Sequence, residues 1–155
     1  MNQCEQLLLA TMSASRFLEG LDPHHIHRLA GLALEAEFEP GRVIFREGDE
    51  QNRLYLILSG TVALRSDPAG TSMLVLRAGD ALGWSALLDG EHRHFEARCM
   101  SPVRALAFEG RELLRAFEAD PRLGYAVMKR LLGVLAGRLE AARHARSEDS
   151  IGVAH

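Results

Sequence analysis

Residues 43–64 read VIFREGDEQNRLYLILSGTVAL, in which short apolar runs are separated by a polar turn and then interrupted at Gly60. Further short apolar runs fill the chain between Leu34 and Phe108, and glycines mark the turns between them. Short strands between glycine turns are typical of two facing antiparallel sheets. No helical pattern separates these runs, which argues against a parallel sheet. The pattern therefore predicts an antiparallel β-roll.

The segments on both sides of this roll have helical periodicity, so the fold class is α+β. The long C-terminal helix is expected to open at Pro121, because proline is favoured in the first turn of a helix. We expect residues 147–155 to form a polar, disordered tail. The predicted domain spans residues 1–146 and comprises N-terminal helices at 1–33, the β-roll at 34–108 and C-terminal helices at 110–146.

The long helix carries two apolar stripes. One follows the spacing of a coiled-coil seam and comprises Met128, Leu132, Leu135, Leu139 and Ala142. The other lies beside it and comprises Val127, Leu131 and Val134. Two stripes favour two partners, the roll and a second subunit, which predicts a homodimer formed through residues 122–146. The alternative is one wide stripe buried within a single subunit.

Composition excludes several classes of protein. The formal net charge is −3 over 155 residues, so the overall field does not favour nucleic acid or an anionic membrane. No apolar run reaches the roughly 18 residues that a membrane span needs. Cys4 and Cys99 are the only cysteines and lie far apart, which favours a reducing cytoplasm. The chain ends nine residues after Arg146, so we expect no separate DNA-binding module and no direct, specific DNA binding.

Two stretches, the one at 43–64 and RAGDALGWSALLDGEHR at 77–93, resemble the cyclic nucleotide-binding domain of catabolite activators and kinase regulatory subunits. The resemblance runs from about Phe17 to Arg143. It implies a jelly-roll-like double-stranded β-helix with N-terminal helices, a short cassette helix and a long C-terminal helix.

The resemblance also implies a binding site. In this family, backbone amides of a short turn and one arginine hold the cyclic phosphate, as suits the N-terminus of a helix. The cassette then falls on Gly83, Trp84, Ser85 and Ala86. Arg93 falls on the arginine of the family, and a shift of one residue would place His94 there instead.

Strand parity favours Arg93 over His94. Alternate residues of a strand share a face, and Phe95, Ala97 and Cys99 form the apolar side of this one. Arg93 has the same parity, so its side chain should point into the roll. A bound anion would satisfy that guanidinium; the alternatives are a salt bridge with Asp80 or Glu91, or an exposed strand end.

The chain departs from the family at Trp84, where the family has a glutamate that accepts a hydrogen bond from the ribose 2′-hydroxyl. Indole has a donor and no acceptor, so it cannot replace the glutamate. Its ring either closes an empty pocket or provides a stacking surface for a different anionic ligand. The long helix has no serine or threonine between 122 and 146, which leaves Arg138 as the candidate contact for a purine base.

A metal site is a further alternative. His92 and His94 form an H-x-H pair, with Glu96 next on the same face, which is the ligand spacing of cupin enzymes. Parity places that face away from the apolar interior, whereas a metalloenzyme needs a recess. No nucleophile or phosphate-loop motif accompanies it, so we expect no enzymatic activity.

The sequence thus predicts a stand-alone sensory or regulatory module. It would bind a cyclic nucleotide, cAMP or cGMP, or another small anionic effector, and signal through its long helix to a separate partner protein. The alternative is a ligand-free dimeric interaction module whose pocket is closed by Trp84.

Overall fold

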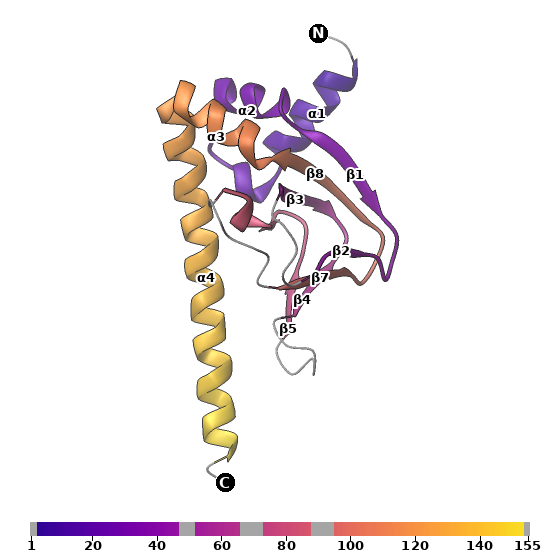
Figure 1. The fold of residues 1–155 in the computed structure, drawn as a ribbon, viewed down its shortest axis with the longest axis vertical. Helices are drawn as coiled ribbons and strands as arrows, with labels where there is room; N and C mark the ends of the chain where they lie inside the picture. The colour runs from indigo at the N-terminus through magenta and orange to yellow at the C-terminus, as the bar shows by residue number, and fades with distance from the viewer. Residues whose placement is uncertain (1–2, 47–51, 66–72, 88–94, 154–155) are drawn as a thin grey trace.

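A computed structural model describes residues 3–46, 52–65, 73–87 and 95–153. Helices cover one end of a two-sheet roll, and the last helix runs along its side and extends past it (Figure 1). The fold is α+β, as predicted, with the α-helices at the two ends of the sequence and the strands between them.

Three short helices precede the roll: α1 at Gln3–Ser13, the 3-10 helix η1 at Arg16–Leu18 and α2 at Pro23–Ala30. Helix α2 begins where the sequence provides an N-cap, because the Asp22 carboxylate accepts a hydrogen bond from the backbone N–H of His24 at 2.8 Å. Pro23 then occupies the first helical position, where its missing N–H costs nothing.

Within the described residues, eight strands form two four-stranded sheets in which every pairing is antiparallel. The first sheet has the order β1-β8-β3-β6, with β1 at Leu34–Phe38, β8 at Val103–Glu109, β3 at Arg53–Ser59 and β6 at Ala81–Leu82. The second has the order β2-β7-β4-β5, with β2 at Val43–Phe45, β7 at Glu96–Cys99, β4 at Val62–Arg65 and β5 at Met73–Leu76. The predicted antiparallel roll is confirmed.

The continuous apolar run of β3 is explained by two cores, one on each face of the first sheet. Leu54 and Leu56 pack with the helices in the first core. Tyr55 and Ile57 point the other way, into the second core between the two sheets. A strand covered on both faces has no polar alternation, which is why residues 54–57 are all apolar.

Two helices close the fold, α3 at Gly110–Ala119 and α4 at Pro121–Val153. Helix α4 opens at Pro121, as predicted, but it continues seven residues past the expected end at 146. The prediction of a disordered tail from 147 is therefore wrong for the backbone up to Val153. Residues 147–153 contain no proline, and their first glycine is Gly152, so the helix has no stop signal between 147 and 151.

The two stripes of α4 have different environments in the single chain. Val127 and Leu131 are buried in the first core, and Val134 packs against it. Leu132 and Leu139 are each 67% exposed. The prediction of two distinct stripes is confirmed, while the partner of the exposed one stays a prediction. In the described part of the chain, no helix is both long enough and apolar enough to cross a membrane.

Candidate functional site

The predicted cassette is a tight turn that follows β6. Gly83 has a φ of +83°, a left-handed conformation that a side chain would strain. The chain then enters the 3-10 helix η2 at Trp84–Leu87, which matches the predicted short cassette helix. Ser85 is 4% exposed, so the turn is built into the body of the protein.

The backbone amides of this turn are partly engaged already. The N–H of Ala86 donates a hydrogen bond to the carbonyl of Gly83 at 3.0 Å, closing the 3-10 turn. An anion at this turn would therefore have to share or displace that bond. Binding of a phosphate by the Ala86 amide stays a prediction.

The cassette rests directly on the start of α3. A Cβ atom added at Gly110 would lie 2.3 Å from the carbonyl oxygen of Ala86. The N–H of Gly110 donates a hydrogen bond to the carbonyl of Asn52 at 2.9 Å, which connects the start of α3 to the residue that precedes β3. Only glycine allows α3 and η2 to approach this closely.

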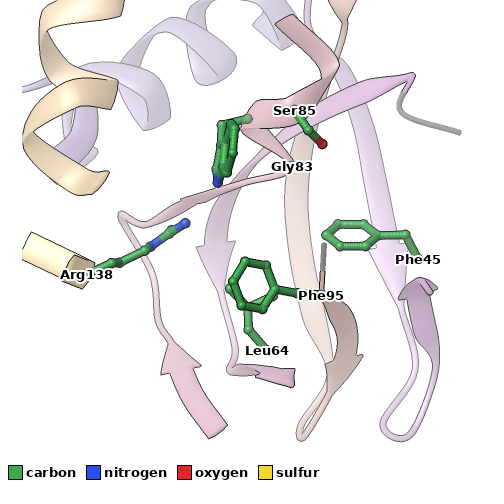
Figure 2. Close-up of a pocket in the computed structure, with 7 residues that line it drawn as sticks. Phe45, Leu64, Gly83, Ser85, Phe95 and Arg138 are labelled. Atoms are coloured by element: carbon green, nitrogen blue, oxygen red, sulfur yellow. The ribbon is translucent and has the colours of Figure 1, made fainter. Parts of the chain in front are cut away.

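A small cavity of about 20 Å³ opens beside the cassette turn. Its described lining residues come from both sheets, the cassette turn and α4: Phe45, Leu64, Gly83, Trp84, Ser85, Phe95 and Arg138. Figure 2 shows Arg138 entering from α4 on one side, with Phe45 on the opposite side. This volume holds about one water molecule, whereas sites for drug-sized ligands have about 300–1,000 Å³. The conformation is thus a closed one.

Trp84 is half-buried and contributes to two environments. It packs against the first core and also lines the cavity. The indole could close the pocket or provide a stacking surface, and both interpretations need it at the cavity. The structure has it there. Trp84 is also the single tryptophan of the chain.

Arg138 is the cation that α4 brings to the cavity. It follows Leu131 and Val134 at spacings of seven and four residues, so it continues the buried stripe of the helix. Its Nη2 donates a hydrogen bond to the carbonyl of Ala81 in β6. Burial lowers the pKa of Arg138, and the nearby Asp80 carboxylate partly offsets this effect. A guanidinium remains charged in proteins, so a positive charge lies at the cavity wall.

The two candidates for the phosphate-binding side chain, Arg93 and His94, lie outside the described residues. The parity argument for Arg93 is tested on its neighbours. Ala97 and Cys99 are buried in β7, and Phe95 packs against the second core and lines the cavity. The inward face of this strand is therefore confirmed as far as Phe95, and the position of Arg93 stays a prediction.

The suggested metal ligands are not assembled by the described residues. His92 and His94 lie outside them, and the Glu96 carboxylate instead accepts a hydrogen bond from Arg98 at 3.3 Å. The described part of the chain contains no cluster of three metal-ligating side chains. Cys99 is buried, and burial raises the pKa of its thiol, which keeps it protonated and unreactive.

Sequence reasoning did not identify Phe45 and Leu64 as lining residues. Both come from the second sheet, in which β2 and β4 pair with opposite edges of β7. Their apolar character indicated strands, and the order of the strands, which places them at the cavity, was needed to see their second role.

The chain is similar to known proteins over most of its length. The family model for the cyclic nucleotide-binding domain matches residues 35–120, which is more than half of the chain and includes the cassette turn. A CRP-like cAMP-activated global transcriptional regulator of Mycobacterium tuberculosis is 31% identical over 131 residues, covering 83% of this chain and 57% of that protein.

Two further relatives match this chain over different shares of their own length. Glutaminase 1 of Bradyrhizobium diazoefficiens is 31% identical over 127 residues, covering 81% of this chain but 20% of that protein. The crystal structure of the Thermus thermophilus catabolite activator protein superposes with a TM-score of 0.70 at 27% identity, covering 88% of this chain and 63% of that chain. This chain therefore spans less than two thirds of each of these three relatives.

Proposed function

This chain belongs to the cyclic nucleotide-binding domain family, and from that premise we propose that it is a regulatory module whose cavity binds a cyclic nucleotide. The observation that supports the proposal most directly is the cavity itself. It lies between the cassette turn, the roll and α4, and a cation from α4 forms part of its wall. A ligand there would contact both the rigid sheets and the helix that leaves the domain.

The proposed ligand site comprises the cassette residues Gly83, Trp84, Ser85 and Ala86, with Arg93 or His94 for the phosphate and Arg138 at the base. Since the cavity of about 20 Å³ is far too small for a nucleotide, binding requires an opened state. A ligand that binds only the opened state shifts the equilibrium by its difference in affinity between the two states. The present geometry is then the ligand-free member of the pair.

Helix α4 would transmit this change. Within residues 121–140, Arg138 makes the last polar contact between the helix and the roll. An opened cavity separates Arg138 from Ala81 and releases the helix beyond it. We propose that the exposed stripe of α4 forms the homodimer interface, and that the repositioned helix is read by a separate partner protein.

The module acts by binding, not by catalysis, in this proposal. The transcriptional regulator and the glutaminase named above each match it over only part of their length, which is consistent with a sensory unit that different proteins combine with different outputs. A buried free thiol at Cys99 fits a reducing cytoplasm.

Calorimetric titration of the full chain with cAMP and cGMP tests the proposal. We expect saturable binding, together with thermal stabilisation worth about 2.7 kcal/mol when the free nucleotide is at 100 times its dissociation constant. Inorganic phosphate and AMP serve as controls for charge and for an uncyclised nucleotide. Absence of binding by both cyclic nucleotides at millimolar concentration would contradict the proposal.

The variant Trp84→Glu tests the role of the departure from the family. A carboxylate accepts a hydrogen bond from the ribose 2′-hydroxyl, so the variant should bind cyclic nucleotides about ten- to a hundredfold more tightly. The 2′-deoxy analogues supply the control: the wild-type protein should not distinguish them from the ribonucleotides, while the variant should. A variant that gains affinity equally for both would show only that the indole blocked the pocket.

A further inference from the structure

A second and larger hollow, which we name the basic groove, lies on the outside of the molecule between η1 and α4. Its volume is about 430 Å³, and its described lining residues are Arg16, Phe17, Glu19, Lys129 and Arg130. None of these residues lines the cavity at the cassette turn. A groove of this volume can receive a ligand as it stands, whereas the cavity of about 20 Å³ cannot.

The basic groove has more positive charge than its own residues neutralise. Its described lining contains three cations and one carboxylate, that of Glu19. Among the described residues, Arg16, Lys129 and Arg130 form no ion pair, and neither does Glu19. The groove therefore offers uncompensated positive charge, although the formal net charge of the chain is −3.

Hydrogen bonds fix the position of Arg130. Its Nη2 donates to the carbonyl of Glu19 at 2.9 Å, and its Nη1 donates to the carbonyl of Ala126 at 3.1 Å. A guanidinium has five N–H donors, so donors remain for a further acceptor. Because Glu19 directly follows η1, its bond with Arg130 also joins the two sides of the groove.

Packing restricts the other two cations. A Cβ atom added at Gly79 would lie 2.9 Å from Cβ of Arg16, so the stem of Arg16 rests on the turn before β6. Nζ of Lys129 lies 5.7 Å from the centre of the Tyr125 ring, which is a cation–π contact. Side chains that are already restricted lose less conformational entropy on binding. All three cations are therefore held ready for an anionic partner.

The exposure of the groove favours an extended ligand over a small one. Arg16 and Lys129 are exposed, and a single exposed ion pair contributes little to binding. A peptide with several carboxylates makes several such pairs at once. Phe17 in the groove and the exposed Tyr125 beside it on α4 add aromatic surface, which protein–protein interfaces favour. A nucleic acid, which is also a polyanion, is disfavoured by the net negative charge of the chain.

We propose that the basic groove docks an acidic segment of the partner protein, whose carboxylates pair with its three cations. This inference rests on the proposed function for the existence of a partner, and it adds where the partner binds and what charge it carries. The groove lies on the part of α4 that Val127 and Leu131 anchor in the first core. Docking is therefore constitutive: the partner stays bound whether or not a nucleotide opens the cavity.

Fluorescence anisotropy of a labelled acidic peptide with the full chain tests the docking site. The probe is a short glutamate-rich peptide with one central phenylalanine, and its control has glutamine in place of every glutamate. We expect saturable binding of the acidic peptide, which weakens as the salt concentration rises. The glutamine peptide should bind at least about tenfold more weakly. A labelled oligothymidylate measures any binding of nucleic acid and should bind more weakly than the acidic peptide.

Two charge reversals locate the binding site. Lys129→Glu and Arg16→Glu each place a carboxylate in the groove, and each should weaken binding of the acidic peptide about tenfold. Arg115→Glu is the matched control, because it makes the same change of charge on α3 at a side chain that is 75% exposed and does not line the groove. It should bind the peptide as the wild type does. Thermal melts check that each variant is folded.

The outcomes separate this inference from the proposed function. Equal binding of the two peptides, tighter binding of oligothymidylate, or equal losses in Arg115→Glu and the groove variants would each overturn the acidic docking site. A change of more than about threefold in peptide affinity on adding saturating cAMP or cGMP would overturn constitutive docking. Calorimetry of Lys129→Glu should give the wild-type affinity for nucleotides. Absence of nucleotide binding by the wild type would overturn the proposed function without changing the peptide result.

Discussion

The two halves of α4 differ in environment. In the first half, Leu123 has no exposed surface, and Val127 and Leu131 are buried with it in the first core. In the second half, Leu139 is 67% exposed, and Arg138 provides the polar contact with the roll. One half is fixed to the body of the domain, and the other extends away from it (Figure 1).

This difference shows how one continuous helix can serve both stability and signalling. Free energy of folding comes from the half whose apolar side chains are removed from water. Leu139, which is exposed, contributes little to the fold of a single chain. A regulatory domain needs such a division, since a helix buried along its whole length could not move.

The largest difference between the two halves of α4 is expected when one leucine in each half is replaced by alanine. Leu123→Ala should lower the free energy of unfolding by about 2–5 kcal/mol, because it leaves a cavity in a fully buried site. Leu139→Ala should change it by less than about 0.5 kcal/mol in the monomer. Urea unfolding followed by circular dichroism at low protein concentration measures both. Similar losses for the two variants would contradict the division.

A charge in the exposed stripe tests what covers it. Leu132→Asp should dissociate the proposed homodimer, at a cost of about 2 kcal/mol or more if this side chain is central to the interface. Sedimentation equilibrium measures the change. The unfolding free energy of the monomer should stay within about 0.5 kcal/mol of the wild-type value. A wild-type protein that is monomeric at high concentration would remove the homodimer from the proposal.

Two glycines provide the smallest and most closely matched test. A Cβ atom at Gly124 would lie 2.8 Å from Cβ of Phe117, whereas one at Gly137 meets nothing within 4 Å. Alanine is favoured over glycine in a helix by about 1 kcal/mol, so Gly137→Ala should stabilise the chain by that amount.

At Gly124 the same gain is opposed by overpacking, which costs about 1–3 kcal/mol. The variant Gly124→Ala should therefore be neutral or destabilised by up to about 2 kcal/mol. Thermal melts of both variants give the sign directly. Stabilisation of both to the same extent would show that α3 and α4 are not closely packed at their crossing.

Much of this architecture follows from local patterns in the sequence. Turn glycines with short apolar runs predicted the roll, and the apolar stripes predicted the two faces of α4. The end of α4 was missed because Ser147–Ser150 are polar without being helix-breaking. Periodicity cannot distinguish an exposed helix that continues from a tail that does not.

The site was predictable only in part. The cassette turn and Trp84 could be located from the family pattern, and Arg138 from the absence of hydroxyl side chains on the helix. The engaged amide of Ala86 could not be foreseen, since it depends on the i to i+3 hydrogen bond of η2. Phe45 and Leu64 reach the cavity through strand order, which is a property of the whole chain.

The contact between Gly110 and Ala86 has a mechanical consequence. Because the first residue of α3 touches the backbone of η2 without any side chain between them, η2 cannot move toward α3 without displacing it. The junction therefore transmits a movement of η2 toward α3 directly. This coupling depends on Gly110, which has a hydrogen atom where every other amino acid has a Cβ atom.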